Sequence, residues 1–313
     1  MQAISTKILF NHCYDKYAIA AVNVFTMEQV HGLFAAAQGC QSPVIVQITP
    51  VARNYAHTKM MMAMVNAVAD IYNDVMYAVH LDHGNEEHAF AAINEGYTSV
   101  MIDASHSAFD ENVARTKAVV EKAHPKNIAV EAELGILSGV EDDISVDESM
   151  SKYTNPQQAW EFVQLTGCDS LAVAVGTSHG AYKFSGKQGL QFSVLKEIQQ
   201  KLPQFPLVLH GASNVRTEDV KSINATGGRL AENATGVSDE ELIQSIQYGV
   251  CKVNIATDLR LLWTKVHRDF FYEYPEKFDP IIPGKKYIEE LKLLLRNKFE
   301  VVGSTGKSTS IKL

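Results

Sequence analysis

Several features that would point to a membrane, secreted or nucleic-acid-binding protein are absent from this sequence. No run approaches the 18 apolar residues that a membrane-spanning helix needs. The first seven residues lack the charged and then apolar order of a signal peptide, so we expect a cytoplasmic protein. A formal net charge of −8 argues against nucleic acid or an anionic membrane as a partner, although a local cationic pocket for a phosphate remains compatible with it.

Cysteine is scarce, and a nucleotide-binding loop is missing. The four cysteines, Cys13, Cys40, Cys168 and Cys251, are scattered without a CxxC pair, which is typical of reduced, buried thiols in a cytoplasmic protein. Residues 303–308 resemble the end of a phosphate-binding loop. That motif requires a glycine at position 301, which is Val301, and the segment has no strand–loop–helix context.

What the sequence does contain is an alternation of eight apolar runs with eight amphipathic segments. Continuous apolar strands are typical of a sheet covered on both faces, and strand–helix alternation predicts parallel pairing. We therefore expect an α/β fold of the (β/α)8 TIM-barrel type, with a doubly wound sheet as the alternative. The expected strands are 18–25, 43–49, 77–83, 99–105, 129–136, 170–176, 207–213 and 252–258. The expected helices are 27–38, 57–72, 86–94, 110–124, 156–166, 189–201, 238–247 and 259–271.

The composition shows no break that would divide the chain. We expect a single barrel domain over residues 1–313, in which 274–313 form an extension with a helix near 285–298. This appended helix would pack on the barrel or on a neighbouring subunit. The connections 137–155, 177–188 and 214–237 exceed the usual two to six residues, which makes them candidates for lids.

Three apolar strands end on histidines, His83, His179 and His210. A buried polar group without a partner costs roughly 2–7 kcal/mol, so something should hold these side chains. Active sites of TIM barrels lie at the carboxyl ends of the strands, where this chain also carries acids, amides and a hydroxyl. These are Asp82, Asp103, Glu133, Ser213, Asn254 and Asp258. The amino ends of the strands carry no comparable polar set.

Three converging imidazoles with an open coordination position are typical of a catalytic zinc site. Taken one at a time, each histidine can equally be a hydrogen-bonded core or rim residue. Asp82 and His83 are adjacent, so their side chains would point to opposite sides of the strand unless the strand bends.

Glu133 shares one face of its strand with a further acid, Glu131. Inside a barrel they must be paired or protonated unless they face a cation, and we expect a metal to neutralise them. Glu141 lies in the long acidic connection and can act only if that segment closes.

A phosphate site is expected near the seventh and eighth strands, the usual position in such barrels. Backbone N–H groups, hydroxyls, an amide and a lysine are available there, and Arg260 can meet a second phosphate. The candidates are Gly180, Lys183, Gly211, Ser213, Asn254 and Thr257.

At these residues the sequence resembles the class II, zinc-dependent fructose-bisphosphate aldolases, a family that includes tagatose-bisphosphate aldolases. The matching stretches run in the family's order over essentially the whole chain, from Asn23 to Gly306. They are Val-His-Leu-Asp-His-Gly (79–84), Val-Glu-Ala-Glu-Leu-Gly (130–135), Gly-Thr-Ser-His-Gly (176–180), Leu-His-Gly-Ala-Ser (209–213) and Lys-Val-Asn-Ile-Ala-Thr-Asp-Leu-Arg (252–260).

The resemblance implies reversible cleavage of fructose 1,6-bisphosphate into dihydroxyacetone phosphate and glyceraldehyde 3-phosphate, with Zn2+ as the Lewis acid. It implies that His83, His179 and His210 are the zinc ligands and that Asp82 is the acid/base on the C4 hydroxyl. It implies that Glu141 exchanges the C3 proton and that Asp103 and Glu133 belong to a second or structural metal position. The residues proposed above for phosphate would bind the C1 phosphate, Arg260 the C6 phosphate, and a monovalent cation (Na+ or K+) can lie beside the former. A homodimer or homotetramer is implied as well.

The sequence departs from the family in two places. Residues 138–141 read Ser-Gly-Val-Glu where the family usually has Gly-Gly-x-Glu, and Ala256 stands where fructose-type members commonly have Asp. Tagatose-type members commonly have Ala at that position, while Asp258 and Arg260 match the fructose type. Fructose 1,6-bisphosphate is therefore the expected substrate and tagatose 1,6-bisphosphate the alternative. A metal-dependent hydrolase and a non-catalytic binding barrel are the rival classes of protein.

Overall fold

The architecture was obtained from a computed structural model. It describes residues 3–136, 138–141, 144–146, 152–179, 189–232 and 236–312, and for 138–141, 144–146, 178 and 179 it describes the backbone alone.

Eight parallel strands form a closed barrel in the order β1-β11-β10-β8-β5-β4-β3-β2. The ring closes where the first strand pairs with both the last strand and the second. Closure confirms the predicted TIM barrel and rules out the doubly wound sheet, which would be open. The strands are β1 (Ile19–Asn23), β2 (Val44–Ile48), β3 (Tyr77–Gly84), β4 (Ser99–Ile102), β5 (Ala129–Leu134), β8 (Ser170–Val173), β10 (Leu207–Leu209) and β11 (Val250–Ile255).

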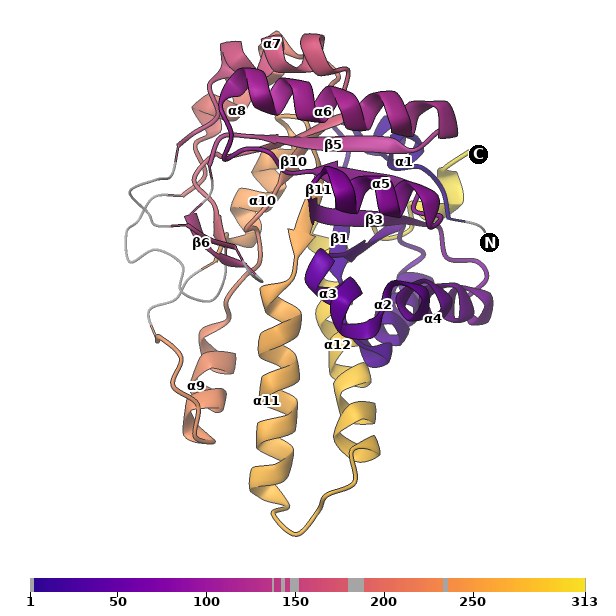
Figure 1. Ribbon diagram of the computed structural model, residues 1–313. Helices are drawn as coiled ribbons and strands as arrows, with labels where there is room; N and C mark the ends of the chain where they lie inside the picture. Colours follow the sequence, from indigo (N-terminus) through magenta and orange to yellow (C-terminus); the bar gives the residue numbers. More distant parts are fainter. Residues whose placement is uncertain are drawn as a thin grey trace.

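Eight helices follow these strands and cover the outside of the barrel (Figure 1). They are α2 (Met27–Cys40), α4 (Thr58–Ile71), α5 (Glu86–Asn94), α6 (Phe109–Ala123), α7 (Pro156–Thr166), α8 (Phe192–Lys201), α10 (Asp239–Ile246) and α11 (Thr257–Glu273). Three of the described helices were not predicted: α1 (Thr6–Cys13), α3 (Pro50–Ala56) and α9 (Thr217–Ala225). Short 3-10 turns occupy His124–Lys126 and Ser308–Ser310.

The helix ends follow local sequence signals. Ser238 accepts a hydrogen bond from the backbone N–H of Glu241, whose carboxylate accepts from Ser238 N–H in return, which forms a capping box at the start of α10. Asn155 caps α7, with Pro156 at its first position and Gly167 in the left-handed conformation after its end. Such caps satisfy backbone groups that a helix end would otherwise leave unpaired.

All three of the long connections contain regular structure among their described residues. Helix α9 (Thr217–Ala225) occupies much of 214–237. Strands β6 (Ser138–Glu141) and β7 (Ile144–Val146) form a small sheet with β9 (Ser178–His179), which directly follows the end of β8. The backbone hydrogen bonds of this three-stranded sheet fix its position beside the carboxyl end of β8, at the mouth of the barrel.

The opposite end of the barrel is closed by α1. Leu9 and Phe10 of α1 pack with Ile19, Ile45 and Ile311 in one buried apolar cluster, so the two ends of the described chain meet beneath the strands. Figure 1 shows the two termini on the same side of the molecule, away from β6.

The predicted C-terminal helix is present as α12 (Ile281–Val301), longer at both ends than expected. It packs on α2, where Leu291 lies against Gly32, and the Tyr287 hydroxyl donates to the carbonyl oxygen of Leu259 in α11. In Figure 1, α11 and α12 run side by side and extend from the barrel as a pair. None of the described helices offers the apolar length that crossing a bilayer requires.

The interior of the barrel is more polar than the sequence suggested. Below the mouth, His80, Ser99, Glu131 and Lys252 are all buried, and Thr6 of α1 reaches Ser99 from the floor. The expectation that polar residues gather only at the carboxyl ends was therefore wrong. The period of two that places Asn254 inward also places Lys252 inward.

Candidate active site

The site is built on a distortion at the end of β3. The register with β4 shifts between Leu81 and Gly84, and His83 has a φ of 49°, which is uncommon for a residue other than glycine. Because of this bend, Asp82 and His83 of β3 both come within 4.8 Å of His210, which follows β10 on the opposite side of the barrel, as measured between ligand atoms. The strand thus bends as Asp82 and His83 require if both side chains are to reach one site.

Two imidazoles face each other at the barrel mouth. His83 Nε2 lies 2.9 Å from His210 Nδ1. The outer nitrogen of each ring contacts a carboxylate: His83 Nδ1 is 3.0 Å from Asp103 Oδ2, and His210 Nε2 is 2.9 Å from Glu131 Oε1.

This arrangement decides which nitrogens can bind a cation. A carboxylate only accepts hydrogen bonds, so both outer nitrogens carry the proton and both inner nitrogens present a lone pair. The amide of Asn254, which can only donate, lies 3.2 Å from His210 Nδ1 and agrees with an unprotonated Nδ1. The Asp82 carboxylate adds a third potential ligand to the group. Carboxylate-supported histidines of this kind are typical of metal ligands, so the residues present fit a divalent metal ion.

The two acids predicted to bind metal lie beside His83. Burial raises the pKa of Asp103, but its hydrogen bonds from His83 and Ser105 outweigh that effect and hold the pKa well below the ordinary value. Burial, followed by the charge of Asp103, raises the pKa of Glu133 well above its ordinary value. Its Oε2 atom has no hydrogen-bond partner among the described residues. His83, Asp103 and Glu133 form a second group with ligand atoms within 4.8 Å.

Asp82 is held by two amides. Asn23 Nδ2 donates to Asp82 Oδ2 at 2.7 Å, and Asn254 Nδ2 donates to Oδ1 at 3.3 Å. Gln47 Nε2 in turn donates to Asn23 Oδ1 at 2.8 Å. The Asp82 side chain is fully buried, so these amides fix the direction in which the carboxylate points.

A helix N-terminus borders the site on the side of β10 and β11. The Ser213 hydroxyl accepts hydrogen bonds from the backbone N–H groups of Ala256 and Thr257, at 3.1 and 3.2 Å, where α11 begins. Gly211 has a φ of 59°, which turns the chain sharply after His210. This end of α11 carries the partial positive charge that attracts anions.

Arg260 lies in the first turn of the same helix. Its guanidinium carbon is 4.8 Å from the centroid of the Phe25 ring, which follows β1 at the same end of the barrel. A cation–π contact of this kind limits the positions the guanidinium can take.

Four predicted residues are described only partly or not at all. For His179 and Glu141 the structure gives the backbone: Gly139 of β6 pairs with His179 of β9, so the strand that carries Glu141 runs beside His179. Gly180 and Lys183 lie outside the described residues.

Glu131 was expected to face a metal ion, but it forms an ion pair with Lys252 instead. Lys252 Nζ lies 2.8 Å from Glu131 Oε2, and the ion pair is buried within the barrel. Sequence reasoning missed Lys252, and it missed Asn23 and Gln47 as supports of Asp82. Each is a polar residue within an apolar strand, a signal as specific as the one that identified Glu133.

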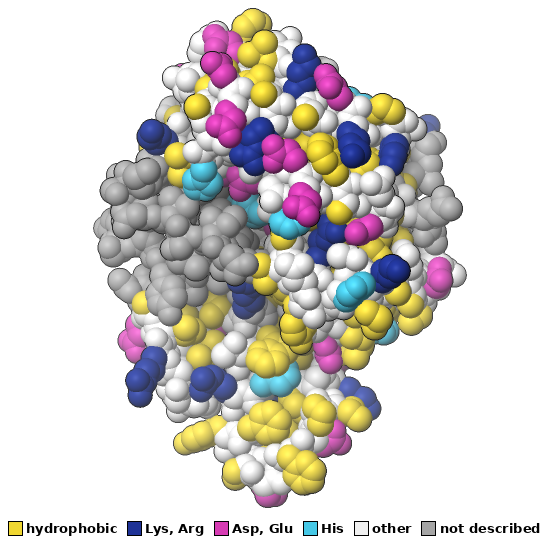
Figure 2. Space-filling model, viewed as in Figure 1, with side chains coloured by type: hydrophobic (Ala, Val, Ile, Leu, Met, Phe, Trp, Pro, Cys, Tyr) yellow, Lys and Arg dark blue, Asp and Glu magenta, His cyan; other side chains and the backbone are white. Residues whose placement is uncertain are grey.

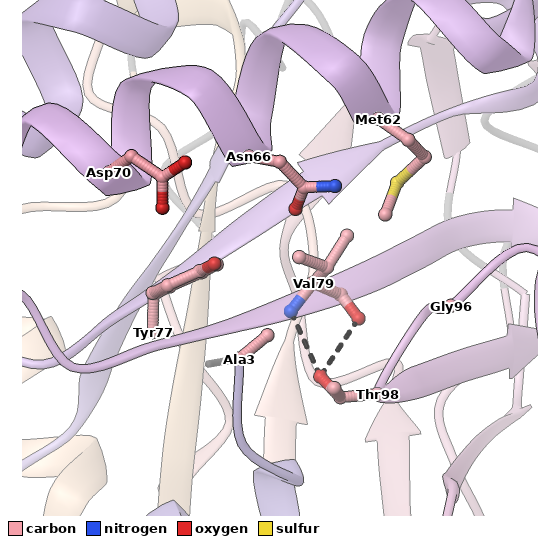
Figure 3. Close-up of a pocket in the computed structure, with 8 residues that line it drawn as sticks. All are labelled: Ala3, Met62, Asn66, Asp70, Tyr77, Val79, Gly96 and Thr98. Carbon is pink, nitrogen blue, oxygen red and sulfur yellow. Dashed lines mark hydrogen bonds between the residues drawn. The ribbon is translucent and has the colours of Figure 1, made fainter. Parts of the chain in front are cut away.

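A separate cavity of about 330 Å³ lies away from the mouth, between α4 and β3 (Figure 3). Tyr77 and Val79 form its floor, and Asn66 and Asp70 line it from α4. The side chain of Thr98 hydrogen-bonds to the backbone of Val79. None of the predicted site residues lines this cavity.

Together, the barrel and its mouth fit a metal-dependent enzyme, with a carboxylate beside the candidate metal ligands and a helix N-terminus next to them. The sequence profile described as class-II fructose-bisphosphate aldolase matches residues 4–307, and this chain belongs to that family. Members are aldolases, so the chain is a carbon–carbon lyase of the metal-dependent class.

Relatives support this family assignment along the whole chain. A fructose-bisphosphate aldolase of Giardia intestinalis is 41% identical over 304 residues, which cover 95% of this chain and 92% of the relative. One from Thermus caldophilus is 41% identical over 94% of this chain and 95% of its own. The crystal structure of the YdjI aldolase from Escherichia coli K12 superposes with a TM-score of 0.79 at 31% identity, covering 98% of this chain and 100% of that one.

Proposed function

We propose that this aldolase cleaves a ketose 1,6-bisphosphate between C3 and C4, with fructose 1,6-bisphosphate as its substrate. The observation that carries the proposal is the group formed by Asp82, His83 and His210, which lies beside the N-terminus of α11 at the barrel mouth. The products are dihydroxyacetone phosphate and glyceraldehyde 3-phosphate, and the reaction is reversible.

His83, His179 and His210 are the proposed ligands of a catalytic Zn2+. When bound there, a divalent cation supplies Lewis acidity to the substrate's carbonyl. Asp103 accepts from the outer nitrogen of His83, so we assign it to orienting that ligand, while Glu133 offers a further carboxylate at the same edge. A monovalent cation near the substrate phosphate is supported by the family resemblance alone.

Asp82 is the proposed acid/base. Its carboxylate, which is held by Asn23 and Asn254, removes the proton of the C4 hydroxyl. The C3–C4 bond then breaks, and the electron pair of that bond stays with the three-carbon ketone. Glu141 is the proposed donor that returns a proton to C3. Its strand runs beside that of His179, which supports a place near the metal ligands.

The substrate's two phosphates are assigned to two separate sets of residues. Gly180, Lys183, Gly211, Ser213, Asn254 and Thr257 are proposed for the C1 phosphate. The backbone N–H groups at the start of α11 support this assignment, because they favour an anion. Arg260 is proposed for the C6 phosphate.

The decisive experiment is a paired assay of the zinc-loaded protein with fructose and tagatose 1,6-bisphosphate, each with and without EDTA. Metal-dependent preference for fructose supports the proposal. Preference for tagatose would make Ala256, which caps α11 beside Ser213, the residue that sets specificity. If the protein cleaves neither substrate, the proposal is wrong. Covalent trapping of the substrate by borohydride would indicate a lysine Schiff base instead.

We further propose a single domain with residues 274–313 as its extension, a cytoplasmic location consistent with four buried free cysteines, and assembly as a homodimer or homotetramer. Apolar side chains gather at the far end of α11 and α12, at the bottom of Figure 2. Among them Phe278 is 91% exposed and Tyr272 71% exposed, which supports a subunit contact there.

A further inference from the structure

A lysine–glutamate pair lies fully buried beneath the metal ligands. Lys252 Nζ donates to both carboxylate oxygens of Glu131, at 3.0 and 2.8 Å, and the two side chains are 0% and 1% exposed. Replacing a buried ion pair by apolar side chains of similar size is often neutral or stabilising. Stability alone is therefore a weak reason for this pair to be here.

The third hydrogen of the Lys252 ammonium is also used. His80 Nε2 lies 3.2 Å from Lys252 Nζ, and an ammonium can only donate, so His80 accepts there and carries its proton on Nδ1. That nitrogen is 2.8 Å from Ser99 Oγ, which also accepts from Thr6 Oγ1 of α1. With three donors and three acceptors in place, Lys252 is anchored from the floor of the barrel.

Glu131 connects Lys252 to His210. Its Oε1 atom, which accepts from Lys252, also lies 2.9 Å from His210 Nε2. The ring of His210 therefore rests on a carboxylate whose other contacts are fixed, and its Nδ1 is directed at His83 Nε2, 2.9 Å away.

We propose that Lys252 and Glu131 are positioning residues for His210, which set its ring orientation and tautomer so that Nδ1 is the atom offered to the metal. The inference rests on the proposed function only in taking His210 as a metal ligand. It assigns the buried pair a task in metal binding that a purely structural ion pair would not have.

The test removes both charges at once, so that no buried charge is left unpaired. The double variant Glu131→Leu/Lys252→Met is compared with Glu131→Gln/Lys252→Met, which restores an acceptor oxygen beneath His210. Affinity for Zn2+ is measured by competition with a chromophoric chelator, and the visible spectrum of the Co2+-loaded protein reports on ligand geometry.

The leucine variant is expected to bind Zn2+ about 10–100-fold more weakly than the wild type, as other changes behind metal-bound histidines do. The glutamine variant is expected to recover part of that loss. Arg53→Met/Glu95→Gln removes a different, partly buried ion pair, at 2.8 Å, and serves as the control that leaves zinc affinity unchanged.

Wild-type zinc affinity in a folded Glu131→Leu/Lys252→Met protein would overturn the inference. A second measurement needs no variant: the 15N chemical shifts of His210 in the metal-free wild type should show a protonated Nε2 and an unprotonated Nδ1. The opposite tautomer would overturn it as well. If the wild type bound no divalent metal at all, the proposed function itself would fail, which is a different result from either of these.

Discussion

At the scale of single residues, the site depends on how side chains are supported. Asp82 accepts from two amides, Asn23 of β1 and Asn254 of the adjacent strand β11, and these hydrogen bonds fix the direction of its carboxylate. In its proposed role as acid/base, this carboxylate is oriented before any substrate binds.

Asp82→Asn should lower kcat for fructose 1,6-bisphosphate by about 10²–10⁴-fold, because an amide cannot take the proton of the C4 hydroxyl. Metal content, measured by atomic absorption, should stay stoichiometric. Retention of full cleavage by this variant would show that another group is the base.

Residue identity was easier to predict than residue contact. His83, His210 and Asp82 were found from the sequence because polar residues at the ends of apolar strands are conspicuous. The partner of Glu131 was not, since the alternation that points Lys252 into the barrel does not tell which of the other inward side chains it contacts. The positive φ of His83 could not be foreseen either, because His is not a residue that favours it.

At the scale of elements, two glycines in one helix differ in what surrounds them. A Cβ added to Gly32 of α2 would lie 2.7 Å from Leu291 of α12, while one added to Gly39 meets nothing within 4 Å. Both residues would gain about 1 kcal/mol of helix propensity as alanine.

Gly39→Ala should therefore raise the free energy of unfolding slightly, whereas Gly32→Ala should lower it by about 1–3 kcal/mol through overpacking against α12. Urea unfolding followed by circular dichroism compares the two. Equal stabilisation by both would mean that α12 yields easily and is not tightly packed on α2.

Helices α5 and α6 are joined by a forked ion pair, in which Arg115 donates to both oxygens of Glu86 at 2.6 and 2.7 Å. The hydrogen bonds from Arg115 hold the pKa of Glu86 below its ordinary value. The pair therefore contributes fully above pH 4.5, the ordinary pKa of Glu86, and its contribution is lost as the pH falls through the lower folded value.

Glu86→Gln should reduce the free energy of unfolding by about 0.5–1 kcal/mol at pH 7 and by less at pH 4. The control is Glu111→Gln, since that carboxylate lies 3.8 Å from the same guanidinium and is 61% exposed. A difference that stays constant between the two pH values would assign the effect to packing rather than charge.

The positions of the eight barrel strands and most of the helices followed from the apolar pattern, because each element has one dominant requirement for burial. The small sheet of β6, β7 and β9 and the helix α9 did not, since these elements are short, from two residues in β9 to nine in α9. Helix α1 was missed for a similar reason: it is only eight residues long, and its packing partners come from distant strands.

At the scale of the whole molecule, the metal should stabilise the fold, since a bound ion favours the folded state by mass action. At a free zinc concentration 100 times the dissociation constant the gain is about 2.7 kcal/mol. For a chain of 313 residues we expect EDTA to lower Tm by about 4 °C in calorimetry. An unchanged Tm would argue that the histidines do not hold a metal in the resting protein.

The exposed end of α11 and α12 should determine the assembly state. Phe278→Glu is expected to lower the molar mass found by light scattering towards that of one chain, because a buried carboxylate opposes the contact. Ile71→Glu, at a residue 62% exposed on α4, is the matched control. A wild-type protein that is already a monomer would contradict the proposed assembly.

The pairing of β1 with β11 has a consequence for biosynthesis. The first strand of the barrel, β1, pairs with the last one, β11, so the ring cannot close until about four-fifths of the chain has left the ribosome. Translation at about 5–20 residues per second leaves β1 without one neighbour for roughly 10–50 seconds. During that time its edge is open to other nascent chains, and Lys252 and Asn254, which arrive with β11, have not yet reached their partners. Assembly of the catalytic centre is thus among the final events in the making of the enzyme, and chaperones that shield the early strands should govern its yield.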